Sequence, residues 1–352
     1  MNESWPSSTR VASCEGEGRV VVGEQDVPIP GDGEILIRTR GCGLCGTDLF
    51  KLQFDSIERG MVLGHELVGD VVAIGTGVES VEIGERIVAP HHVSCGACHF
   101  CRSGNEPLCP TFFDNLLSPG GFSDYVLLGA RLVREAIYRF DDSIPDASAL
   151  FVEPAGCVVR SVRRAGDLSI VGSTVVVMGG GSMGLLHLLV LKALHPRVAV
   201  VIVDPIESRR ALALELGASR VAEPGEDATG TVKQLTDGRG ADVVFDTVGG
   251  SRLLGVSLDL LRGGGTAVLF AHGADGESAN FELNLLFKGE KRIVAAYSSS
   301  LEDQRIAWKL ISSGAMDPSP LVTHRIPLER FDEAVRLMRT HEAIKVMIVP
   351  GV

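Results

Sequence analysis

The feature that most constrains this chain is a Gly-rich hexapeptide set between a strand pattern and a helix pattern. Residues 174–178 are apolar and mostly β-branched, residues 179–184 read Gly-Gly-Gly-Ser-Met-Gly, and residues 185–193 continue as an apolar helix. A second strand, residues 198–203, ends in Asp204. Such glycines let a pyrophosphate approach the backbone at a helix N-terminus. The hexapeptide alone is weak evidence, but with strand, helix and acidic residue in register it predicts a dinucleotide site.

Further strand and helix patterns follow in alternation. Residues 241–246, 266–270 and 292–296 read as strands, and residues 253–261 as a helix. Alternation of this kind predicts a parallel, doubly wound sheet that binds its ligand at the carboxyl ends of the strands. The candidate cofactor-binding residues are therefore Gly179, Gly181, Ser182, Met183, Gly184, Asp204, Arg209, Thr247 and His272. Arg209 either reaches the adenosine ribose or is solvated, and a loop His such as His272 is more often solvated.

The first third of the chain has a different sequence pattern. Short β-type runs, as in residues 19–22, 34–38, 67–74 and 85–89, are separated by Pro and Gly. This pattern predicts an antiparallel β domain. With 352 residues the chain is long enough for two domains.

One stretch of this β domain, residues 41–48, brings together a thiol, a hydroxyl and a carboxylate. Cys45 can bind Zn²⁺ as thiolate, Thr47 can hydrogen-bond an alcohol, and Asp48 can orient a neighbouring imidazole. Cys42 and Cys45 also form a Cys-x-x-Cys, so a redox pair is an alternative reading.

Three further side chains extend this candidate site. His65 and Glu66 are adjacent, a pair that is more often structural than metal-binding. Glu153 precedes Pro154, which predicts extended chain rather than the interior of a helix, and a Glu that caps a following helix is the alternative. Either Glu66 or Glu153 can be the direct metal ligand, so both are candidates.

Four cysteines form the most specific signal in the chain. Cys95, Cys98, Cys101 and Cys109 are spaced so that four thiolates can wrap one tetrahedral Zn²⁺, leaving no open position. Such a closed site is structural. An iron–sulfur cluster, whose ligand spacing can be similar, is the alternative.

Composition excludes several classes of function. A net charge of −12 argues against nucleic acid and anionic membranes as partners. The first ten residues are polar and show no secretory signal, so we expect a cytoplasmic protein. The longest apolar stretch, residues 170–194, is interrupted by glycines, a His and a Lys, which argues against a membrane span.

Taken together, these motifs resemble the zinc-dependent medium-chain dehydrogenases, the broad group of sorbitol, threonine and alcohol dehydrogenases. The resemblance implies an α/β protein in which a GroES-like, β-rich catalytic domain accompanies a Rossmann domain with a doubly wound parallel sheet. The implied domains are residues 1–158 with a structural zinc lobe at 91–110, the NAD-binding residues 159–296, and a return to the catalytic domain at 297–352. It also implies NAD, two Zn²⁺ per subunit and a homo-oligomer, either a dimer or a tetramer.

The expected reaction is hydride transfer between NAD and a secondary alcohol, or its ketone, on a polyol, sugar or similar polar metabolite. The catalytic zinc would use Cys45, His65 and either Glu66 or Glu153. L-Threonine 3-dehydrogenase, suggested by His92 three residues before Cys95, and a simple alcohol dehydrogenase are the alternatives within the class. A quinone-reductase-like or structural relative without catalytic metal is the alternative outside it. Phe50, His92 and Ser298 to Ser300 are candidate pocket residues.

Overall fold

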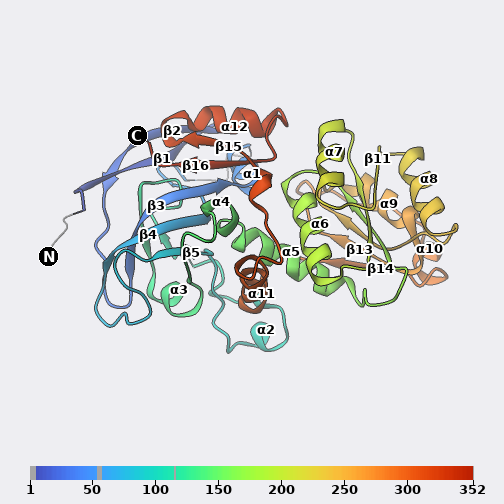
Figure 1. Cartoon of the computed structure of the whole chain (residues 1–352), viewed down its shortest axis with the longest axis horizontal. Helices are drawn as coiled ribbons and strands as arrows, with labels where there is room; N and C mark the ends of the chain where they lie inside the picture. The colour runs from blue at the N-terminus through green and yellow to red at the C-terminus, as the bar shows by residue number, and fades with distance from the viewer. Residues whose placement is uncertain (1–4, 54–57, 115, 352) are drawn as a thin grey trace. The chain divides into compact units, whose positions relative to one another are not determined.

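The computed structural model describes residues 5–53, 58–114 and 116–351, and these fall into two compact units (Figure 1). Unit 1 comprises Met1–Pro154 and Ser300–Val352, and unit 2 comprises Ala155–Ser299. In Figure 1 the first strands, in blue, and the last strands, in red, belong to the same unit. Among the described residues, no helix has both the length and the hydrophobicity to cross a bilayer.

Unit 1 is built on a mostly antiparallel eight-stranded sheet, and this confirms the β-rich domain. Its main order is β15-β16-β3-β4-β5-β8, and β7 pairs with β3 and β6. The strands are β3 (Ile35–Leu44), β4 (Glu66–Ile74), β5 (Arg86–Ala89), β6 (Leu117–Ser118), β7 (Tyr125–Leu128), β8 (Tyr138–Phe140), β15 (Val322–Pro327) and β16 (Lys345–Val349). A separate hairpin joins β1 (Ser8–Gly16) to β2 (Arg19–Asp26).

Short helices complete unit 1. They are α1 (Gly46–Gln53), α2 (His99–Arg102), α3 (Ala130–Glu135), α4 (Asp146–Ala149), α11 (Leu301–Ser312) and α12 (Phe331–Arg339). Apolar side chains of the strands form the main core, to which Phe331 of α12 contributes, and Leu36 and Ala73 belong to a smaller cluster. Ser300 and Asp303 form a capping box at the start of α11, so the Ser300 side chain, which we expected in the pocket, stabilises a helix end.

The register of the sheet determines which loops meet. Gly43 of β3 pairs with Glu66 of β4, and Leu44 pairs with Val346 of β16. The end of β3, the start of β4 and the start of β16 therefore lie side by side. Cys45, which follows β3, is brought next to His65 and Glu66 by this pairing alone.

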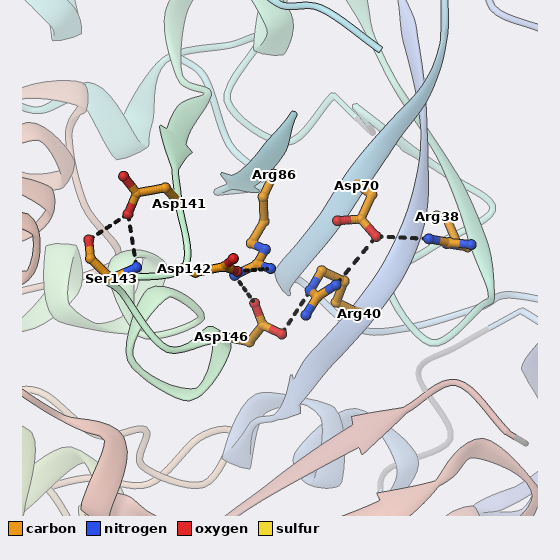
Figure 2. Close-up of polar contacts among 8 residues, drawn as sticks. All are labelled: Arg38, Arg40, Asp70, Arg86, Asp141, Asp142, Ser143 and Asp146. Carbon is orange, nitrogen blue, oxygen red and sulfur yellow. Dashed lines mark hydrogen bonds and ion pairs between the residues drawn. The ribbon is translucent and has the colours of Figure 1, made fainter. Parts of the chain in front are cut away.

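A network of ion pairs ties three strands of this sheet to the start of α4 (Figure 2). Asp70 of β4 lies 3.1 Å from Arg38 and 3.5 Å from Arg40, both of β3. Asp146 of α4 lies 2.8 Å from Arg40 and 3.7 Å from Arg86 of β5. Because Glu153 follows only seven residues after Asp146, the network fixes the start of the segment that carries Glu153.

Unit 2 contains a six-stranded parallel sheet in the order β11-β10-β9-β12-β13-β14, which confirms the doubly wound fold. The strands are β9 (Thr174–Met178), β10 (Ala199–Val203), β11 (Arg220–Ala222), β12 (Ala241–Asp246), β13 (Leu261–Leu269) and β14 (Arg292–Ala295). The helices are α6 (Ser182–Leu194), α7 (Glu207–Glu215), α8 (Glu226–Leu235), α9 (Ser251–Leu260) and α10 (Leu283–Phe287). The strand order reverses beside β9, where such folds bind their ligand.

One local prediction is wrong. Glu153 does not lie in extended chain but in the first turn of α5 (Val152–Ala165). Pro154 is tolerated there because the first N–H groups of a helix have no partner inside the helix. A carboxylate at this position also interacts favourably with the positive end of the helix dipole. The alternative interpretation, which placed Glu153 at the start of a helix, is therefore correct for its backbone.

Candidate metal centres and dinucleotide site

The first candidate centre lies at the end of β3. Ligand atoms of Cys45, His65 and Glu66 lie within 4.8 Å of one another, close enough to share a single ion. Cys45 and His65 are partly exposed, and Glu66 is fully buried. One thiolate, one imidazole and one carboxylate form a donor set that suits Zn²⁺ and leaves room for a further ligand. The residues present therefore fit a catalytic zinc.

Asp48 is placed to orient this group. Its Oδ2 accepts a 2.9 Å hydrogen bond from the backbone N–H of Cys45, and its Oδ1 lies 3.4 Å from Nδ1 of His65. Burial alone would lower the pKa of His65, but the Asp48 carboxylate outweighs burial and raises that pKa well above its ordinary value. Because Nδ1 faces Asp48, Nε2 is the nitrogen available to a metal.

Lys345 is a neighbour that the sequence did not suggest. Its Nζ lies 2.7 Å from each carboxylate oxygen of Glu66, and the two side chains are 2% and 0% exposed. Burial alone would lower the pKa of Lys345, yet the Glu66 carboxylate raises it above its ordinary value. A Lys at the head of the otherwise apolar run Lys345–Val349 was the available signal, since a buried ammonium requires a partner.

Glu153 lies outside that group of three donors within the described residues. Its Oε1 is 3.7 Å from Nδ1 of His91, and the His91 ring lies 4.5 Å from the ring of His65, centroid to centroid. Burial lowers the pKa of His91 well below its ordinary value, so this imidazole is neutral. His91 was not among the residues predicted for the pocket, although the adjacent His92 was.

The His92 ring packs against the rings of His91, Phe112 and Phe113 at tilted or edge-on angles. Its centroid lies 3.5 Å from that of His91, 4.4 Å from that of Phe112 and 5.4 Å from that of Phe113. Burial lowers the pKa of His92 to about 3. His92 therefore offers a neutral hydrogen-bonding group in an aromatic setting.

Two residues of α1 complete the surroundings. Thr47 lies in the first turn and is partly exposed, and no protein group hydrogen-bonds its hydroxyl within the part of the chain that the structure describes. Phe50 follows one turn later and is partly exposed. Cys42 lies in the core, where burial raises its thiol pKa well above the ordinary value, and this disfavours the reactive thiolate that a redox pair requires.

The second candidate centre is the four-Cys lobe around α2. Ligand atoms of all four cysteines lie within 4.8 Å of one another, and Sγ of Cys101 is 3.9 Å from Cys95 and 3.5 Å from Cys98. A tetrahedral Zn²⁺ with Zn–S bonds of about 2.3 Å requires sulfur separations of about 3.8 Å. Burial alone would raise the pKa of Cys109, but the backbone N–H of Cys95, which donates to its Sγ, helps to lower it to about 6. The lobe therefore fits a structural zinc.

The Gly-rich loop of unit 2 has the shape that a dinucleotide requires. Gly179 has a φ of +100°, and a Cβ there would lie 2.8 Å from Oγ1 of Thr247. A Cβ at Gly184 would overlap the carbonyl oxygen of Gly179. No side chain caps the N-terminus of α6, and the buried Ser182 hydroxyl has no partner among the described residues. The loop thus leaves donors for a pyrophosphate.

The remaining cofactor candidates are distributed around this loop. Asp204 accepts hydrogen bonds from the N–H groups of Gly180 and Ile206, at 2.7 and 2.8 Å, and its Oδ2 lies 3.8 Å from Nη1 of Arg209. Arg209 is therefore held beside Asp204 rather than solvated. The Thr247 hydroxyl donates to the Met178 carbonyl at 2.7 Å, which ties β12 to β9. Met183 lies in the first turn of α6, and His272 is exposed beyond β13.

Comparison with known proteins identifies the family. An alcohol dehydrogenase GroES-like domain matches residues 31–136, and a zinc-binding dehydrogenase domain matches residues 182–313. The L-threonine 3-dehydrogenase of Pyrococcus horikoshii is 32% identical over 334 residues, which are 93% of this chain and 94% of that protein. The chain is a zinc-dependent medium-chain dehydrogenase.

Solved structures of other medium-chain dehydrogenases agree with this assignment. A zinc-binding dehydrogenase from Sinorhizobium meliloti 1021, bound to NADP, superposes with a TM-score of 0.86 at 26% identity and covers 98% of this chain and 100% of its own. The L-idonate 5-dehydrogenase of Escherichia coli K-12 gives 0.83 at 25% identity, with 97% and 98% covered. The family assignment confirms an oxidoreductase that uses zinc and a nicotinamide dinucleotide.

Proposed function

We propose that this dehydrogenase oxidises a secondary alcohol on a small polar metabolite with NAD. The observation that carries the proposal is the donor set at the end of β3, in which Cys45 and His65 are joined by the Glu66 carboxylate instead of a second thiolate. When bound there, zinc polarises the alcohol or carbonyl oxygen and favours loss of the hydroxyl proton near neutral pH. Glu153 is a further candidate donor, because its Oε1 lies 3.7 Å from Nδ1 of His91, whose ring lies beside that of His65.

The residues of the chain supply the rest of the chemistry. Asp48 orients His65, and Thr47 offers its hydroxyl as the first carrier of the substrate proton. Asp204 and the glycines of residues 179–184 hold the dinucleotide. The four-Cys lobe would hold the second, structural zinc.

A substrate panel with NAD tests the proposal. We expect kcat/KM for sorbitol, L-idonate or L-threonine to exceed that for a primary alcohol by roughly tenfold or more. Polar groups in a site favour a substrate that forms hydrogen bonds with them. L-Threonine is the second candidate, since the neutral His92 lies at the site and the sequence relative from P. horikoshii is a threonine dehydrogenase. Activity with quinones alone, in a protein that holds no zinc at Cys45, would contradict the proposal.

Cofactor choice gives a separate prediction. We expect NAD to be preferred over NADP, because Asp204 would repel a 2′-phosphate and can accept a hydrogen bond from the ribose 2′-hydroxyl. Asp204→Asn keeps an oxygen for the Gly180 N–H and removes the charge, so the NAD/NADP ratio of kcat/KM should fall by about tenfold. Arg239→Gln, on another loop of unit 2, is the control. A higher catalytic efficiency with NADP in the unaltered enzyme would overturn the assignment of Asp204.

We also propose a homo-oligomer in the cytoplasm. β14 is an edge strand, and in the neighbouring α10 Leu283 and Phe287 are 77% and 81% exposed, an apolar surface that a second copy would cover. No disulfide joins any of the eight cysteines, all of which the structure describes, as a reducing compartment favours.

Light scattering during size-exclusion chromatography tests the oligomer. Phe287→Asp should shift a dimer or tetramer toward smaller species, because it places a charge in the proposed interface. Val171→Asp changes an equally exposed apolar residue outside that surface and should leave the mass unchanged. A Phe287→Asp enzyme with the unaltered mass would contradict this interface.

A further inference from the structure

Lys345 has no role in the function proposed so far, although it forms a buried ion pair with Glu66, a member of the donor set. Both carboxylate oxygens of Glu66 lie 2.7 Å from Nζ of Lys345, and neither side chain is more than 2% exposed. Removing two charges from water costs several kcal/mol per ion, and their attraction often fails to offset that cost. Packing alone would have been satisfied by two apolar residues here.

The position of the pair indicates what it acts on. Glu66 is one of the three donors that lie within 4.8 Å of one another, so the ammonium stands directly behind the candidate zinc site. The backbone also makes room for the pair, because a Cβ at Gly43 would overlap Oε2 of Glu66. Nζ of Lys345 further donates to the Leu44 carbonyl at 3.4 Å, one residue before Cys45.

Charge balance then follows from the contacts. A carboxylate that is paired with an ammonium on both oxygens adds little net charge to a neighbouring cation, whereas an unpaired one adds a full negative charge. An additional negative charge at the metal would hold it more tightly and weaken its pull on the substrate oxygen. The ammonium of Lys345 therefore opposes both effects.

We propose that Lys345 is a positioning residue that sets the charge of the zinc site, because its ammonium neutralises Glu66 and holds that carboxylate beside Cys45 and His65. The inference rests on the proposed zinc at Cys45. Lys345 thus regulates metal retention although it lies 279 positions away from Glu66 in the sequence.

The test is a double-mutant cycle that measures the rate of zinc release from the holoenzyme into a colorimetric chelator. The rate compared is that of the kinetic phase which is absent in Cys45→Ser, because this phase reports the ion at Cys45. Lys345→Met should slow release by roughly tenfold, because Glu66 loses its counter-ion and turns to the metal. Glu66→Met should speed release by roughly tenfold, because the ammonium is left unbalanced beside the metal. The double variant lacks the Glu66 donor but also lacks the unbalanced ammonium, so it should release zinc more slowly than Glu66→Met by roughly threefold or more. Lys309→Met removes an exposed Lys of the same unit, on α11, and should leave the release rate unchanged.

The outcomes separate this role from a merely structural one. If Lys345→Met releases zinc at the unaltered rate or faster, or if the double variant behaves like Glu66→Met, the proposal is wrong. If Lys345→Met does not fold, comparing the release rates of the double variant and Glu66→Met still decides whether Lys345 sets the charge of the site or is merely structural. The zinc content of Cys45→Ser tests the zinc site itself. If Cys45→Ser loses one zinc ion as expected but Lys345→Met releases zinc at the unaltered rate, only the role of Lys345 is wrong.

Discussion

Replacing Cys45 with Ser is expected to abolish dehydrogenase activity and to remove one of the two zinc ions of each subunit. The thiolate is the single sulfur donor in the group that also contains His65 and Glu66, and a neutral hydroxyl is a much poorer ligand for zinc. The four-Cys lobe is unaffected and keeps its ion. Elemental analysis of the purified variant, together with steady-state kinetics, measures both effects.

Cys42→Ala is the matched control for this experiment. Cys42 lies only three residues earlier but is fully buried in the apolar core, so its loss should leave both zinc ions in place. In the unaltered enzyme a chelator should remove the ion at Cys45 before the ion of the closed lobe, since an open coordination position permits exchange. A Cys45→Ser protein that still holds two zinc ions would show that this site is misassigned.

Local sequence patterns predicted the features whose cause is local. β9, the Gly-rich loop and α6 follow one another without interruption, so periodicity and the glycines were enough to predict the strand–loop–helix unit. The four cysteines span only residues 95–109, and their spacing alone indicated a shared ion. Both predictions depend on residues that meet because the chain between them is short.

Features that depend on the sheet register could not be predicted in the same way. Lys345 meets Glu66 because β16 pairs with β3, which in turn pairs with β4, and no local pattern encodes that order. His91 became part of the site through contacts with Glu153 and His65, neither of which is its neighbour in sequence. The backbone of Glu153 was predicted wrongly because a Pro after it was read as excluding a helix, although the first helical turn accepts Pro.

The second large effect is expected from Thr47→Val, which should lower turnover by about two orders of magnitude or more while the zinc content stays unchanged. Oxidation requires the alcohol to lose its proton, and a positioned proton-transfer group contributes about 10²–10⁴-fold to such a step. Thr47 lies two residues after Cys45, in the first turn of α1, and its hydroxyl has no partner within the described ranges. Val has nearly the same shape, so packing changes little.

The onward path of this proton is constrained by the residue that lies five positions beyond Cys45. That position is Phe50 here, and a phenyl ring exchanges no proton, so Thr47 must pass the proton to water or to the cofactor ribose. If the proton goes to water, a carboxylate can accept it next, and because Glu66 is engaged by Lys345 through both oxygens, Glu153 is the carboxylate that remains. Thr47→Ser keeps a hydroxyl and should retain turnover within about tenfold, whereas Phe50→His adds an exchanging group only beyond Thr47 and should not rescue Thr47→Val. Nearly full turnover of Thr47→Val with a secondary alcohol would make Thr47 a structural residue and this proton path wrong.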